Sequence, residues 1–215
     1  MRGVTTSGRD SYHHGDLRNA LAEAAAGLAE RGGPDAVTIR AAAREVGVTP
    51  TATYRHFSSQ VDLLEAAKDQ ALDGMARAVA GYLAQIPEDG DPVEIAVRRL
   101  EASGRGYIRF ALEQPGLFRT AFCRTPMHEG GRQLSEAGPY ALLSQLLDDL
   151  VEVGDLDPER RVGAEAAAWS TVHGLSMLLI DGPLQGLSAD AREDVIDRTL
   201  AMVSRGLGGG PRART

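Results

Sequence analysis

Residues 37–64, VTIRAAAREVGVTPTATYRHFSSQVDLL, carry the start and stop signals of two short helices separated by a tight turn. Thr38 is a good N-cap, because its hydroxyl can accept a hydrogen bond from an otherwise free backbone N–H. Gly47 can adopt the positive φ that a sharp turn requires. Between these two residues, the spacing of apolar side chains predicts a helix over residues 39–46.

The second helix is predicted to begin at Pro50, after the N-cap Thr49, and to run to about residue 56. Two such helices form a helix-turn-helix, whose second helix presents short side chains to base edges in the major groove. Here those side chains would be Thr49, Thr51, Ala52 and Thr53. A threonine can hydrogen-bond a base or a phosphate and touch a thymine methyl group. The alternative for this fragment alone is an ordinary helical hairpin.

The charge of the chain is distributed unevenly, which bears on DNA binding. The formal net charge is -7 at pH 7, yet residues 1–60 hold seven arginines and six acidic residues, a net of +1. DNA phosphates respond to charges within about one Debye length, ~8 Å at physiological salt, and not to the distant sum. The acidic balance therefore does not exclude a DNA-binding N-terminal part.

Helical spacing of apolar residues, alanine-rich runs and breaks at Gly or Pro predict an all-α chain of about nine helices. The expected helices cover residues 13–31, 39–46, 50–56, 59–86, 92–113, 116–123, 134–152, 158–180 and 188–206. The length of 215 residues fits one domain or two closely packed domains.

Several other functions lack their sequence patterns. No apolar run approaches the roughly 20 residues that a bilayer span needs, and we expect a cytoplasmic protein. Cys123 is the only cysteine, which excludes an intramolecular disulfide and a multi-cysteine zinc site. His13, His14 and His128 lack the spacing of metal ligands. Because no nucleophile elbow, P-loop or dinucleotide fingerprint occurs either, we expect no enzyme, no cofactor and no metal.

The stretch YHHGDLRNALAEAAAGLAERGG, followed by TIRAAAREVGVTPTATYRHFSSQVDLL, resembles the TetR family of transcriptional regulators over residues 12–65. The resemblance implies that Tyr54 and His56 lie on the DNA-backbone side of the recognition helix, and that Phe57 anchors the three-helix unit. It also implies a homodimer whose variable C-terminal domain binds a small molecule.

Two positions depart from the family pattern. Gln60 stands where many relatives have a basic residue, and Thr53 stands where relatives often have an apolar residue or proline. Thr53 could therefore face either the bases or the core. The residues that we expect to meet DNA are Thr38, Arg40, Arg44, Thr49, Pro50, Thr51, Ala52, Thr53, Tyr54, Arg55, His56 and Gln60.

The C-terminal part supplies candidates for a ligand pocket. WSTVHG, residues 169–174, has the Trp-x-x-x-His-Gly spacing of one class of TetR C-terminal domain, and residues 107–122 look like the middle helices of that class. Trp169 and His173 share a helix face and could line a cavity. The alternative is that Trp169 packs in the core and His173 bonds a carbonyl. By association, the remaining candidates are Tyr107, Phe110, Phe118, Phe122 and Met177.

The sequence therefore predicts an arm at residues 1–11, a helix-turn-helix domain at 12–58, a ligand-binding and dimerisation domain at 59–207 and a disordered tail at 208–215. The dimer is expected on residues 158–180 and 188–206, with the stripe Ile196, Leu200, Val203 and Leu207. The expected function is a ligand-responsive repressor that binds an inverted-repeat operator in double-stranded DNA. The competing interpretation is a helical scaffold protein whose hairpin packs on a protein partner.

Overall fold

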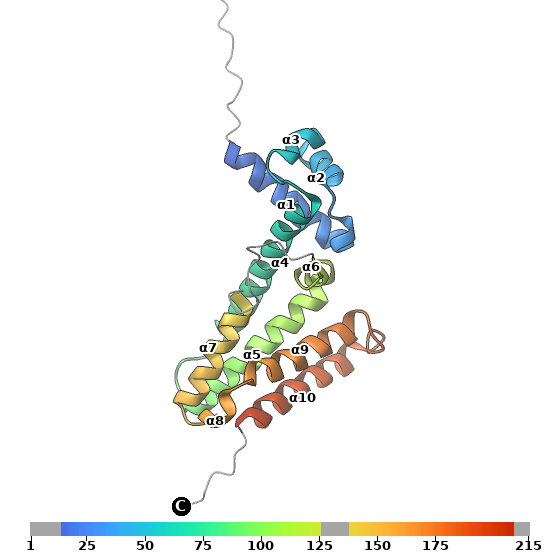
Figure 1. Ribbon diagram of the computed structural model, residues 1–215. Coiled ribbons are helices and arrows are strands. Elements are labelled where there is room, and N and C mark those ends of the chain that lie inside the picture. Colours follow the sequence, from blue (N-terminus) through green and yellow to red (C-terminus); the bar gives the residue numbers. More distant parts are fainter. Residues whose placement is uncertain (1–13, 126–137, 209–215) are drawn as a thin grey trace, which may run out of the picture.

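The computed structural model describes residues 14–125 and 138–208, and this part of the chain is all-α, without strands (Figure 1). The sequence-based prediction of fold class is confirmed. The α-helices are α1 (His14–Gly32), α2 (Ile39–Val46), α3 (Pro50–Tyr54), α4 (Gln60–Leu83), α5 (Pro92–Glu113), α6 (Pro115–Ala121), α7 (Gly138–Glu152), α8 (Pro158–Arg161), α9 (Ala164–Ile180) and α10 (Ala189–Gly208). None of these described helices is long and apolar enough to cross a membrane.

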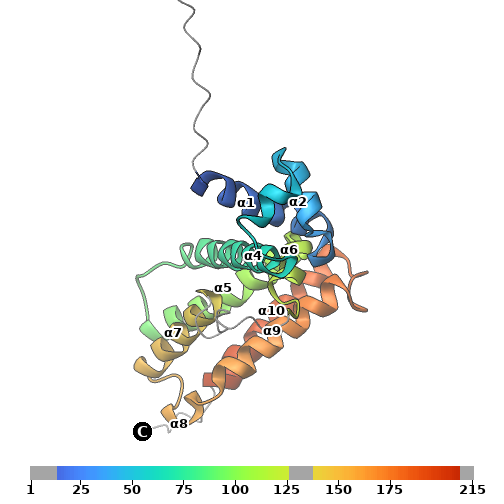
Figure 2. The same ribbon diagram turned by 45° about the horizontal axis from the view of Figure 1, so that its top comes forward.

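The N-terminal unit packs α1, α2, the turn that follows α3 and the start of α4 around one apolar core (Figures 1 and 2). Phe57 lies in this core and is 1% exposed, as expected for its anchor. The predicted caps are confirmed, because Thr38 accepts a hydrogen bond from the Ala41 N–H and Thr49 accepts one from the Ala52 N–H. Gly47 has φ 75°, so it makes the left-handed turn between α2 and α3.

Helix α4 belongs to two cores. Leu63 and Ala67 pack into the N-terminal core, whereas Met75 and Val79, about two to four turns further on, pack into the core of the C-terminal part. The helix ends at Leu83 instead of the predicted residue 86. Its last residues form tighter turns before Pro87, which disfavours helical backbone in the residue that precedes it.

The C-terminal part surrounds α5, which packs against α4, α7, α9 and α10. The prediction of one helix over residues 158–180 is wrong. The chain breaks at Val162, which is extended, and at Gly163, whose φ of 79° is left-handed, so α8 and α9 are separate helices. Residues 1–11 and most of the predicted tail lie outside the described residues, as does the predicted start of α7.

The stripe that was expected to form the dimer is largely internal. Ile196 and Leu200 are 0% and 5% exposed, and both pack in the core with α5 and α9. Val203 and Leu207 are half-buried, and Leu207 contacts a third apolar cluster between α5 and α7. The spacing of these residues correctly identified a packing face of α10. That face packs against helices of the same chain.

Helix α6 joins the two parts through a close backbone contact with α1. A side chain at Gly116 would place its Cβ 2.3 Å from the Ala29 carbonyl oxygen and 2.4 Å from that of Glu30. The next residue, Leu117, packs against both the N-terminal and the C-terminal core. Glycine at 116 is therefore what permits α6 to rest on the end of α1.

Gly116→Ala is expected to lower the melting temperature, because the clashing atoms are backbone and α6 must move away from α1. We expect a loss of about 1–3 kcal/mol of unfolding free energy, the usual cost of overpacking. Thermal and urea denaturation measure it. Gly81→Ala is the matched control, since Gly81 lies in α4 with no atom near its missing Cβ, and alanine should stabilise that helix by roughly 0.5–1 kcal/mol. An equal effect of both substitutions would contradict the contact.

Candidate DNA-binding surface and ligand pocket

Five of the twelve residues predicted to meet DNA are exposed on α3 or directly beside its ends. Thr51 and Arg55 are exposed, and the ring of Tyr54 projects with 56% of its surface accessible. Thr49 and Pro50 begin this surface, while Ala52 and His56 are half-buried. Arg40 and Arg44 on α2 and Gln60 at the start of α4 are also exposed, and Thr38 is half-buried because its hydroxyl caps α2.

Thr53 does not belong to this surface. Its side chain is 0% exposed, and its hydroxyl has no hydrogen-bond partner among the described residues. The prediction that Thr53 contacts DNA is wrong, because position 53 is the inward-facing position of α3. The apolar residue that many relatives carry there fits this environment.

Arg18 is a residue that sequence reasoning missed. Its guanidinium lies 4.5 Å from the centre of the Phe57 ring and donates a hydrogen bond to the His56 carbonyl oxygen. A cation over an aromatic face is attracted by the ring electrons. Arg18 therefore fastens the end of α3 to α1, and no local sequence pattern marks it.

A mostly apolar cavity of about 60 Å³ lies between α4, α5, α7, α9 and α10. Of the predicted pocket residues, Tyr107, Phe122 and Trp169 line it. Sequence reasoning missed Glu101 and Tyr140, which also line it. The complete wall consists of Leu72, Val79, Leu100, Glu101, Ser103, Gly104, Tyr107, Phe122, Pro139, Tyr140, Leu143, Ala168, Trp169, Val172, Leu200 and Val203.

The other four predicted pocket residues lie behind the wall or outside it. Phe118 is 0% exposed and its ring stacks on His173, with 5.4 Å between ring centres. Phe110 is buried in the C-terminal core. Met177 is 37% exposed and does not line the cavity, so this cavity gives no support to its assignment to a ligand pocket.

Trp169, Tyr107 and His173 are linked by a chain of two hydrogen bonds. The Trp169 indole N–H donates to the Tyr107 hydroxyl at 3.0 Å, and that hydroxyl lies 2.9 Å from His173 Nδ1. Because the hydroxyl already accepts the indole proton, its own proton can bond Nδ1, which leaves the His173 proton on Nε2. Burial lowers the pKa of His173 and raises that of Tyr107, so all three groups are neutral near pH 7. His173 thus bonds a tyrosine hydroxyl, and not a carbonyl as the alternative interpretation supposed.

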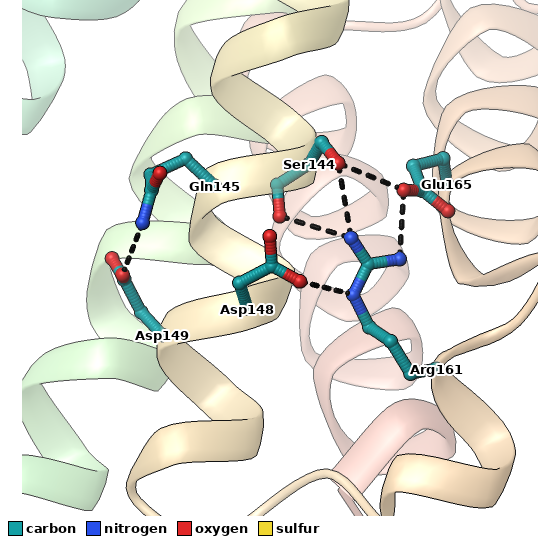
Figure 3. Close-up of polar contacts among 6 residues, drawn as sticks. All are labelled: Ser144, Gln145, Asp148, Asp149, Arg161 and Glu165. Carbon is teal, nitrogen blue, oxygen red and sulfur yellow. Dashed lines mark hydrogen bonds and ion pairs between the residues drawn. The ribbon is translucent and has the colours of Figure 1, made fainter.

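Arg161 fixes two walls of the cavity relative to each other (Figure 3). From α8 it donates to Asp148 and to the Ser144 carbonyl and hydroxyl oxygens on α7, and at 2.7 Å to Glu165 on α9. Burial alone would raise the pKa of Glu165, but hydrogen bonds from its own backbone, Arg161 and Ser144 hold it below the usual range. The pair is only 19% and 15% exposed, so water screens it weakly.

The buried position of Thr53 predicts that its hydroxyl is dispensable. Thr53→Val should keep DNA affinity within a few-fold and raise the unfolding free energy by about 1 kcal/mol, because an unpaired buried hydroxyl is removed. Thr51 lies two residues before Thr53, on the exposed side of α3. Thr51→Val should change DNA binding without raising the unfolding free energy. Binding isotherms and thermal denaturation of both variants measure this. Loss of DNA binding in Thr53→Val alone would contradict the assignment.

Two family models match separate parts of the chain. Residues 21–67 match "Bacterial regulatory proteins, tetR family", and residues 100–203 match "Tetracyclin repressor-like, C-terminal domain". The first range contains the helix-turn-helix, and the second contains most of the cavity wall.

Individual relatives agree with these matches. An uncharacterised HTH-type transcriptional regulator of Mycobacterium tuberculosis is 26% identical over 174 residues, 81% of this chain and 75% of that protein. A structure of a protein of unknown function from Rhodococcus sp. RHA1 has a TM-score of 0.74 at 26% identity, covering 93% and 100% of the two chains. A TetR-family regulator from Shewanella sp. PV-4 has a TM-score of 0.64 at 17% identity, covering 89% and 97%. The chain belongs to the TetR family of transcriptional regulators.

Proposed function

We propose that this protein is a homodimeric repressor that binds an inverted-repeat operator in double-stranded DNA and leaves it when a small molecule enters the cavity. The observation that carries the proposal is the exposed face of α3, with Thr51, Tyr54 and Arg55, on a helix-turn-helix whose α4 also lines the cavity. Acting on DNA, it would work in the cytoplasm.

The local charge of the helix-turn-helix supports binding to phosphates. Arg40, Arg44 and Arg55 are exposed, and no ion pair occupies them among the described residues. Glu45 is the only acidic residue between positions 38 and 57, and its carboxylate is paired with Arg31 at 2.8 Å. The field that DNA meets at α2 and α3 is therefore positive despite the acidic chain.

Operator binding tests the proposal directly. A sequence selected from a random DNA pool should be bound with a steep dependence on salt, because phosphate contacts release counterions. Arg44→Gln should reduce the slope of log affinity against log salt by ~1. Arg98→Gln, an exposed arginine on α5, is the control and should leave the slope unchanged. If wild type binds no DNA in a salt-dependent manner, the scaffold interpretation stands instead.

The dimer is proposed on the outer side of α9 and α10, which lie side by side at one edge of the molecule (Figure 1). Leu178 and Met177 on α9 and Met202 on α10 have 44%, 37% and 59% of their surfaces exposed. Large apolar side chains that stay exposed on adjacent helices are candidates for an interface. A two-fold axis through it would turn the two α3 helices toward two half-sites.

Leu178→Glu is expected to make the protein monomeric, because a carboxylate would be buried against the partner's apolar surface. Sedimentation at micromolar concentration should show the change, and operator affinity should fall at least about tenfold, since a monomer contacts one half-site. Ala80→Glu, on an exposed position of α4, is the control for added charge. A dimer that persists in Leu178→Glu places the interface elsewhere.

The switch would act through α4. A ligand that displaces Leu72 and Val79 in the cavity wall moves the same helix whose Leu63 and Ala67 support the N-terminal unit. For release, the ligand must bind the DNA-incompetent arrangement more tightly, and operator must weaken ligand binding by the same factor. A coupling of ~1–3 kcal/mol is typical of such systems.

A further inference from the structure

We propose that the cavity selects lipophilic molecules that carry a positively charged amine, with Glu101 as the counter-ion. This inference rests on the proposed function, since it specifies the ligand class of the cavity through which the switch would act. It is carried by one carboxylate and four aromatic rings in a wall whose other residues are apolar except for Ser103.

Glu101 lies on α5 and is half-buried at the cavity wall. One carboxylate oxygen accepts a hydrogen bond from the Ser204 hydroxyl at 2.6 Å, which orients the group. Among the described residues, no basic side chain forms an ion pair with it. Partly buried acidic side chains are normally paired with a cation, and Glu101 lacks such a partner among the described residues.

The two arginines at helical ion-pair spacing from Glu101 on its own helix are occupied by other partners. Arg98 and Arg105 lie three residues before and four residues after Glu101, the spacing at which helical ion pairs form. Arg98 instead bonds Glu94 at 3.2 Å, and Arg105 bonds Glu193 at 3.4 Å on α10. The pairing on α5 therefore leaves the charge of Glu101 available to a ligand.

Aromatic rings complete the same wall. Tyr140, Trp169 and Phe122 form a connected group, with ring centres 6.1 Å apart for Tyr140 and Trp169 and 5.9 Å apart for Phe122 and Trp169. Ring faces attract cations, most strongly where water is excluded. A cationic head group would be favoured by both the carboxylate and the rings, whereas an anionic one would meet repulsion from Glu101.

Matched probes separate charge from hydrophobicity. Phenylethylamine, phenylethanol and 3-phenylpropanoate share a phenyl group, and decylamine, decanol and decanoate share a longer chain, so the two series also cover two sizes. Trp169 is the only tryptophan of the chain and lies in the wall, so quenching of intrinsic fluorescence reports binding at this site. We expect each amine to bind at least about tenfold more tightly than its alcohol, the size of one hydrogen bond to a charged group.

Glu101→Gln should abolish the preference for the amine while the alcohol binds as before. Glu113→Gln, an exposed position on the same helix, should keep the wild-type preference. Equal binding of amine and alcohol by wild type, tighter binding of the carboxylate, or no binding by either series would overturn the proposal. So would an amine preference that survives in Glu101→Gln, because the selectivity would then come from another group.

Operator release distinguishes this inference from the proposed function. The tighter-binding amine should dissociate the wild-type protein from its selected DNA, and Glu101→Gln should need a higher amine concentration by the same factor as its loss of affinity. If wild type binds its operator but shows no amine preference, the ligand class is wrong and the repressor proposal stands. If wild type binds amines but no DNA, the repressor proposal fails and the cavity assignment stands.

Discussion

The structure depends on helix α4, which contributes buried residues to two separate apolar cores. Along α4, Leu63 and Ala67 complete the core under the helix-turn-helix, and Met75 and Val79 complete the core of the C-terminal part. Neither core can close without α4, because its residues are at or near zero exposure in both. The two parts of the molecule therefore cannot change their relation to each other without moving this helix.

The other walls of the cavity are held by directional bonds. Arg161 ties α7 to α9, and Arg109 ties α5 to α10 through Glu193 at 2.5 Å. Helix α4 instead meets α5 through close apolar packing. A side chain at Gly106 would place its Cβ 2.8 Å from the Val79 Cα. Apolar contacts have no preferred direction. A ligand that needs more room than the cavity offers thus meets least directional resistance at α4.

The sequence predicted those features that depend on local chemistry. The caps Thr38 and Thr49 and the turn at Gly47 set α2 and the start of α3, because each acts on neighbouring backbone groups. Side chains whose role is set by distant contacts were not predictable. The inward position of Thr53 depends on how α3 packs against α2, and the role proposed for Glu101 depends on which acidic residues of α10 occupy Arg105.

The spacing of residues on one helix also could not distinguish a side chain that lines the cavity from one that packs behind it. Trp169 and His173 share a face of α9, yet only Trp169 lines the cavity, and His173 reaches it through the Tyr107 hydroxyl. The Tyr107 hydroxyl accepts from Trp169 and has one proton for His173, so His173 is coupled to Trp169 through this hydroxyl. The neutral state of His173 therefore matters to the shape of the cavity, because a protonated Nδ1 could no longer accept the bond that orients Tyr107.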